Sequence, residues 1–241
     1  GNTLTISGLE TLTGLSTGND VVTIASGGIT LLTTGIETLL GGTGTDLVTL
    51  GGSGQTVTVG ALESLVGSAG NDSAIMNSGG NTLAVTLVES VTGGTGNDTV
   101  SLSGTTSSTL SVSLVETLIG NSGVNALALS AAGGSTLSVR QIESLVGNSG
   151  NDMVADTGAG GSTVTITAIE TFLGGGGNDL VTLGGAGATV TVGGVESLTG
   201  STGTDLLNFL TSGGSVAVSL VESLVGGSGN DQATLSSSNG N

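Results

Sequence analysis

Carboxylates recur along this chain at fixed positions, and they are the side chains on which ionic chemistry would depend. An aspartate follows each glutamate after nine residues, or after ten in the first copy, and the fifth copy has an asparagine in that place. The set is Asp20, Asp46, Asp72, Asp98, Asn125, Asp152, Asp179, Asp205 and Asp231. Most of these residues close a glycine-rich segment, as in residues 41–46 and 93–98. Because glycine permits positive φ, such a corner can turn backbone carbonyls toward the carboxylate.

These corners predict oxygen ligation of a metal. Ca²⁺ takes six to eight oxygen ligands at about 2.3–2.6 Å, from carboxylates, amides and backbone carbonyls. The candidate ligands are the eight aspartates, Asn125 and the carbonyls of the corners. The glycines that shape the four clearest corners are Gly41, Gly44, Gly93, Gly96, Gly174, Gly177, Gly226 and Gly229. The competing interpretation is purely structural, since Gly-Asn-Asp is also a turn-forming sequence.

The residue inventory excludes most other chemistry. The 241 residues include 18 acidic residues, one basic residue and no His or Cys, which gives a net charge of −17. Without His, Cys or Lys there is no usual general base, thiolate, Schiff base or zinc ligand. We therefore expect no enzyme. An acidic chain is repelled by phosphate, so nucleic acid is not an expected partner. No apolar run is long enough for membrane insertion.

The glutamates reveal an internal repeat that fills the chain. They are 26 or 27 residues apart, at Glu10, Glu37, Glu63, Glu89, Glu116, Glu143, Glu170, Glu196 and Glu222. In every copy an aliphatic residue precedes the glutamate, Ser or Thr follows it, and glycine stands four residues beyond. Two-residue alternation predicts three short strands in each copy: one before the glutamate, one around it and one after the aspartate.

Such a unit cannot bury its inner face alone, but stacked units can. The sequence therefore predicts an all-β fold, a parallel β-solenoid (β-helix) of nine coils of 26–27 residues with three strands per coil. Residues 1–241 would form a single repeat array, centred on the nine glutamates and uncapped at both ends.

Stacking one repeat per coil has an electrostatic consequence. Aspartates one coil apart, about 4.8 Å, would repel each other by roughly 1 kcal/mol in water. Several Ca²⁺ ions stacked along one edge would reverse this repulsion, so we expect folding to depend on calcium. The glutamates would either lie near the ions or accept hydrogen bonds from backbone amides at a bend.

The corners resemble a known repeat, the nonapeptide Gly-Gly-x-Gly-x-Asp-x-U-x of RTX (hemolysin-type) calcium-binding proteins, in which U is a large apolar residue. Residues 41–49, 93–101, 174–182 and 226–234 match it, the last with Ala233 at U. The resemblance implies Ca²⁺ bound by the aspartates and loop carbonyls, and folding outside a bacterial cell after type I secretion. The usual coil of that family has 18 residues and ions on both edges. The longer repeat here resembles those of secreted surface-layer proteins and adhesins.

The two broad faces of the predicted solenoid carry fewer residues that indicate a function. Thr stands seven residues before the glutamate in eight copies and Ser215 in the ninth, which is compatible with an ice-binding hydroxyl array or with ordinary strand propensity. Asp156 and Arg140 interrupt the repeat. We interpret them as a surface adjustment, a mutual pair or a local metal ligand rather than as catalysts.

These observations predict an extracellular or cell-surface structural protein: a surface-layer, biofilm-matrix filament or adhesin-stalk module that folds on binding Ca²⁺. Its partners would be calcium and either further copies of itself or adjoining solenoid of the same chain. The alternatives are an ice-binding or carbohydrate-binding surface, or the calcium-binding tail of a secreted hydrolase.

Overall fold

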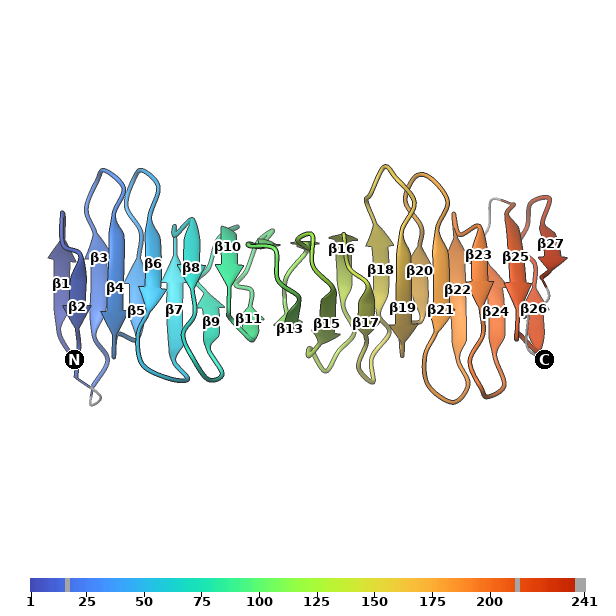
Figure 1. The fold of residues 1–241 in the computed structure, drawn as a ribbon, viewed down its shortest axis with the longest axis horizontal. Helices are drawn as coiled ribbons and strands as arrows, with labels where there is room; N and C mark the ends of the chain where they lie inside the picture. The colour runs from blue at the N-terminus through green and yellow to red at the C-terminus, as the bar shows by residue number, and fades with distance from the viewer. Residues whose placement is uncertain (16–17, 211–212, 237–241) are drawn as a thin grey trace. The chain divides into compact units, whose positions relative to one another are not determined.

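The computed structural model describes residues 1–15, 18–210 and 213–236, and this part of the chain is built from short strands joined by corners. It divides into two compact units, Gly1–Gly123 and Val124–Asn241, which are described separately. In both units all strand pairs are parallel, and successive strands alternate between two sheets (Figure 1). The predicted all-β parallel solenoid is confirmed.

In the first unit, odd-numbered strands form one sheet and even-numbered strands form the other. The odd-numbered strands are β1 (Thr3–Ile6), β3 (Val21–Ile24), β5 (Thr38–Leu40), β7 (Thr56–Gly60), β9 (Ser73–Met76), β11 (Ser90–Thr92) and β13 (Ser108–Ser113). The even-numbered strands are β2 (Thr11–Thr13), β4 (Thr30–Thr34), β6 (Leu47–Leu50), β8 (Ser64–Val66), β10 (Thr82–Thr86), β12 (Thr99–Leu102) and β14 (Thr117–Ile119).

The second unit repeats this arrangement. Its odd-numbered strands are β15 (Asn125–Leu129), β17 (Ser144–Val146), β19 (Thr163–Thr167), β21 (Leu180–Leu183), β23 (Ser197–Thr199), β25 (Ser215–Ser219) and β27 (Gln232–Leu235). Its even-numbered strands are β16 (Thr136–Arg140), β18 (Met153–Asp156), β20 (Thr171–Leu173), β22 (Thr189–Gly193), β24 (Leu206–Phe209) and β26 (Ser223–Val225).

Alternation along each strand fills the space between the sheets. In β7, Val57 and Val59 are buried while Thr56 is exposed. Parallel register then stacks like on like: Leu65 of β8 pairs with Val85 of β10. The core therefore consists of aliphatic columns with almost no aromatic residues. Because these columns hold the strands in register, they also fix the position of each corner along the solenoid.

The predicted coil was wrong in size. Each 26–27-residue repeat does contribute three strands, but a coil needs only two, one in each sheet, so the described part of the chain makes about 13 turns instead of nine. Corner residues bonded across neighbouring coils are 17 or 18 residues apart. Because three is odd, each repeat covers one and a half coils, and equivalent strands of successive repeats lie in opposite sheets. Sequence periodicity measures the repeat and says nothing about how many strands close one turn.

This half-coil offset gives three kinds of corner along each edge. An aspartate corner ends at Asp, a glutamate corner ends at Glu, and a variable corner lies in between, as at residues 51–55. Hydrogen bonds between coils place them in the order variable, aspartate, glutamate: Ile29, Asp46, Glu63. The cycle then begins again with Asn81 and Asp98.

Candidate functional site

The corner aspartates tie neighbouring coils together, and all of them except Asp231 are buried. Asp98 is 0% exposed. Its Oδ1 accepts the backbone N–H of Asn81, one coil back, at 2.8 Å, and its Oδ2 accepts the N–H of Gly94 in its own corner at 2.8 Å. The Nδ2 of Asn81 adds a third bond at 2.9 Å. Three N–H groups therefore donate to this carboxylate without a metal.

The same arrangement recurs at the other aspartate corners. Oδ1 of Asp46, Asp72, Asp152 and Asp205 accepts an N–H from the preceding coil, and Oδ2 accepts one from the corner itself. In Asp20, Asp179 and Asp231 the bond to the preceding coil is also present. The backbone N–H of Asn2, then its side-chain amide, hold the pKa of Asp20 below its ordinary value.

The glutamates accept hydrogen bonds from backbone amides, which is one of the two roles that the sequence left open. Oε2 of Glu63 accepts the backbone N–H of Asp46, one coil back, at 2.8 Å. Equivalent bonds of 2.7–2.8 Å reach Oε2 of Glu37, Glu89, Glu116, Glu143, Glu170, Glu196 and Glu222. An aspartate and the glutamate that accepts its N–H together therefore link three consecutive coils.

The expected stack of aspartate over aspartate along one edge is wrong. The residue one coil before Asp46 is Ile29 and the residue one coil after it is Glu63. The next aspartate on that edge, Asp98, lies three coils further, which is about 14 Å at 4.8 Å per coil. Successive repeats place their aspartates at opposite edges, because the repeat is one and a half coils long. The Asp–Asp repulsion that motivated calcium is therefore absent, although Asp and Glu carboxylates lie in adjacent coils.

The predicted corner glycines have steric roles. A Cβ on Gly41, Gly93 or Gly174 would collide with a carbonyl oxygen one coil on, that of Ala61, Leu114 or Gly194. A Cβ on Gly226 would lie 2.8 Å from Oδ2 of Asp231. Gly44, Gly96 and Gly177 have φ of 119°, 115° and 96°, which side chains rarely adopt. Gly229 lies in the last aspartate corner. Gly41, Gly93 and Gly174 therefore let neighbouring coils approach closely.

Asn125 marks the one corner where the amide replaces the acid. Its backbone N–H still donates to Oε2 of Glu143 at 2.7 Å. Its Nδ2 donates to the carbonyl of Gln141 at 3.0 Å and to Glu143 at 3.3 Å. The asparagine thus donates to the following coil, whereas the aspartates accept from the preceding one.

A second corner feature was missed in the sequence. The residue two before the glutamate has φ of 50–65° in all nine copies. Three are glycine (Gly8, Gly35, Gly194), and six are not (Ala61, Leu87, Leu114, Gln141, Ala168, Leu220). Left-handed backbone costs about 1–2 kcal/mol per non-glycine residue. The glycines in three copies were the available signal, but the six larger residues concealed it.

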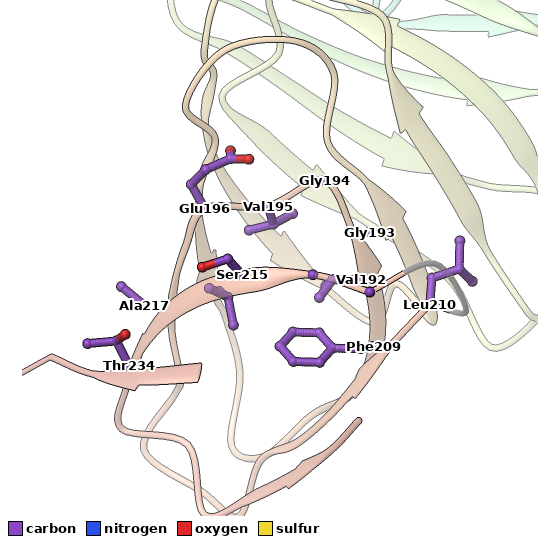
Figure 2. Close-up of a pocket in the computed structure, with 13 residues that line it drawn as sticks. Val192, Gly193, Gly194, Val195, Glu196, Phe209, Leu210, Ser215, Ala217 and Thr234 are labelled. Atoms are coloured by element: carbon purple, nitrogen blue, oxygen red, sulfur yellow. The ribbon is translucent and has the colours of Figure 1, made fainter. Parts of the chain in front are cut away.

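Hollows recur beside the glutamate corners. One of about 520 Å³ lies between residues 192–196 and the strand edge at Phe209, Ser215 and Ala217. Figure 2 shows the Glu196 carboxylate turned away from Phe209 and Ser215, and its Oε2 accepts the N–H of Asp179 at 2.8 Å. An equivalent hollow of about 480 Å³ lies beside Glu63. Neither provides a pair of carboxylates for acid–base chemistry.

The breaks in the repeat fall on structural positions. Asp156 stands where the other copies bury Ile24, Leu50 or Leu183, and its Oδ1 accepts the N–H of Gly158 at 2.8 Å. In the register Asp156 pairs with Val139, next to the exposed Arg140.

The threonines seven residues before the glutamates are exposed but do not form a regular array. Thr30 neighbours Leu47, which neighbours Ser64, because equivalent threonines alternate between the two sheets.

The acidic side chains do not fit the predicted calcium column. Among the described residues, no three Asp or Glu side chains are grouped so that they could hold a metal ion. An aspartate corner offers one Asp carboxylate, and the glutamate corner in the next coil offers one Glu carboxylate, as in Asp46 and Glu63; both accept backbone N–H groups. We therefore derive no folding step from calcium, and calcium binding stays a prediction. In the same part of the chain, no helix has the length and apolarity that a membrane crossing requires.

Comparisons with protein-family models, with known proteins and with solved structures find no match to this chain. The interpretation of its function therefore depends on the fold and on the contacts of its own residues.

Proposed function

We propose that this chain is a structural module of a secreted or cell-surface bacterial protein, such as a surface-layer, matrix-filament or adhesin-stalk segment. One observation carries the proposal: the side chains that could do chemistry serve the fold. Five Asp carboxylates, among them Asp98, accept N–H groups from two coils, and the glutamate of the next coil accepts the Asp N–H. Its RTX-like corners favour an extracellular location.

The coil length supports the resemblance to RTX repeats in one respect. Bonded corner residues lie 17 or 18 residues apart, close to the 18-residue coil of that family. The motif corners, however, are separated by a glutamate and a variable corner on each edge. Two motif corners are never neighbours, so a bound ion would meet one aspartate instead of two.

Circular dichroism in excess chelator tests whether the solenoid folds without calcium. We expect the β signal to persist without calcium, because five of the buried Asp carboxylates accept a backbone N–H at each oxygen. Loss of the β signal in chelator, with recovery on adding Ca²⁺, would show metal-coupled folding and overturn this account of the corners. Added Ca²⁺ that only raises the melting temperature would indicate binding to the folded chain.

Ligand assays on the folded chain test the structural role itself. The alternating sheets break the hydroxyl array that ice binding needs, and the chain has no Trp or Tyr on which a sugar ring could stack. We expect no inhibition of ice recrystallisation and no retention by a panel of polysaccharides. Specific retention by one polysaccharide would replace the structural role with a binding role.

A further inference from the structure

The glutamate corner at Glu63 is joined less closely to the next coil than to the coil before it. Toward the preceding coil, the Glu63 carboxylate accepts the N–H of Asp46. Toward the following coil, the bonds found among the described residues use the backbone alone, from the Ala84 N–H to the Glu63 carbonyl. The corner at Glu196 has the same arrangement, with the Ala217 N–H as donor. The step from glutamate corner to variable corner is therefore left open to other molecules.

A hollow lies at this step in each unit. The Glu63 hollow has a volume of about 480 Å³ and lies between residues 61–63 and residues 77–82 of the next coil. The Glu196 hollow has a volume of about 520 Å³ (Figure 2). Both volumes fall in the range of about 300–1,000 Å³ that is typical of small-molecule sites, so either hollow can hold a side chain of a partner.

The residue two before the glutamate distinguishes these hollows from a third. It is Ala61 in the Glu63 hollow and Gly194 in the Glu196 hollow. Where it is Leu87, which lines the equivalent hollow beside Glu89, only about 80 Å³ is left. Ala61 and Leu87 have the same left-handed backbone, with φ of 50° and 54°. A small side chain at this position therefore opens the hollow, and leucine closes it.

Glu63 and Glu196 each keep one carboxylate oxygen for a ligand. Oε2 accepts the N–H of an aspartate, whereas no hydrogen bond to Oε1 is found among the described residues. Both glutamates are exposed. A single free oxygen suits the point charge of an ammonium group. The planar fork of a guanidinium group is best matched by two free oxygens.

The composition and the walls favour the same ligand. The chain has 18 acidic residues and one basic residue, so cations to balance its charge have to come from other molecules. Ala61, Leu62 and Ala84 give the Glu63 hollow an aliphatic wall, along which the four-carbon stem of a lysine can lie. In the view of Figure 2 the Glu196 carboxylate lies beyond Val195, away from Phe209, at the margin of its hollow.

We propose that the hollows beside Glu63 and Glu196 bind lysine side chains of a partner protein. The stem lies along the aliphatic wall, and the ammonium group at the margin donates to Oε1 of the glutamate. This inference goes beyond the proposed structural role, because it names two contact points on the solenoid edges and the chemistry of the partner.

NMR titration with a lysine peptide tests the proposal residue by residue. The probe is the blocked peptide Gly-Gly-Lys-Gly-Gly, and the same peptide with norleucine keeps the stem without the charge. We expect saturable amide shifts in residues 61–63 and 77–82, and in residues 194–196 and 213–217, with a Kd of about 1 mM. Norleucine should bind about fivefold more weakly. An arginine peptide that binds more tightly than the lysine peptide would overturn the assignment to lysine.

Two variants separate the hollow from its charge. Ala61→Leu closes the Glu63 hollow and keeps the carboxylate, and Leu87 shows that leucine adopts this backbone conformation. Glu63→Gln keeps the shape and removes the charge. Each should weaken the binding that residues 77–82 report about fivefold. Each should leave the binding at Glu196 unchanged, which serves as the control within the same molecule. Matching melting temperatures would show that the variants fold.

Glu89→Gln is the matched control for charge, because the hollow beside Glu89 is closed by Leu87. It should leave peptide binding unchanged. The proposal is overturned if no saturable shift occurs at either hollow. It is also overturned if Glu89→Gln weakens binding as much as Glu63→Gln while Ala61→Leu has no effect, since the peptide would then bind only to the overall negative charge. In both cases an intact β signal would leave the structural role standing.

Discussion

The backbone N–H of Asp98 donates to Oε2 of Glu116, one coil on, across 2.7 Å. Asp98 in turn uses both carboxylate oxygens to accept N–H groups from the coil before it and from its own corner. The pair therefore connects three coils, with the two negative charges in adjacent coils. Its stability reflects a balance between hydrogen bonding to buried amides and repulsion between like charges.

Glu116→Gln separates these two effects. Glutamine keeps an oxygen that can accept the Asp98 N–H but removes one charge, so we expect unchanged stability or a gain of up to about 1 kcal/mol at low salt. Glu116→Ala leaves the amide without its acceptor and should cost about 1–3 kcal/mol. Urea denaturation of both variants in chelator gives the comparison. A loss with glutamine as large as with alanine would contradict the acceptor role.

Asp98→Asn should destabilise the chain by about 1–3 kcal/mol in urea denaturation. The new amide group must face one of the N–H donors that now point at the two oxygens, so one donor loses its acceptor. Asp156→Asn is the matched control, because Asp156 is half-buried and its carboxylate accepts one bond, from Gly158. Equal losses at the two sites would count against the two-coil role of Asp98.

The Asp98→Asn and Asp179→Asn double variant tests the calcium hypothesis that the sequence raised. If these aspartates are ligands, the variant should raise the calcium concentration needed for the midpoint of any Ca²⁺-dependent change in circular dichroism. If they serve only as hydrogen-bond acceptors, the variant should lower stability equally in calcium and in chelator. The Ca²⁺ titration of the unaltered chain is the reference for both outcomes.

The sequence predicted the strands well because the evidence for them is local. Alternation in residues such as 56–59 and the glycine columns were enough to indicate three strands per repeat and a parallel solenoid. The closure of a coil is not local. It depends on which strand pairs with which, and Val21 pairing with both Thr3 and Thr38 is visible only in three dimensions. The sequence therefore could not show that Asp46 lies beside Glu63 and not beside another aspartate.

Gly93→Ala and Gly194→Ala should lower the stability of the chain by very different amounts, although both replace a corner glycine. A Cβ at Gly93 would collide with the Leu114 carbonyl, so the coils must separate, and we expect a loss of about 3 kcal/mol or more. Gly194 occupies a left-handed position that alanine also occupies at Ala61 and Ala168, so its loss should be about 1 kcal/mol. Thermal unfolding of both variants is the measurement. Similar losses would contradict the close approach at Gly93.

Asp156→Leu should stabilise the chain by about 1 kcal/mol. Leucine fills the inward position as Leu50 and Leu183 do, and each of those is at most 3% exposed. The gain from apolar burial, about 2 kcal/mol, is partly offset by loss of the bond from Gly158. Urea midpoints compare the variant with the unaltered chain. A lower midpoint would show that the carboxylate has a role beyond its one hydrogen bond.

The N–H and side-chain amide of Asn2 lower the pKa of Asp20 from its ordinary value of 3.8. A depressed folded-state pKa means that this carboxylate contributes stability above pH 3.8, and the contribution disappears as the pH falls through the folded pKa. We expect β1 to loosen from β3 in that acid range, detected as faster amide exchange at Asn2. Asn2→Ala removes the 3.0 Å side-chain bond but keeps the backbone bond, so it should raise the pKa only partly. Carboxyl NMR titration measures both values, with the urea-unfolded chain as control. A folded pKa equal to the unfolded one would show that the bonds to Asn2 do not form in solution.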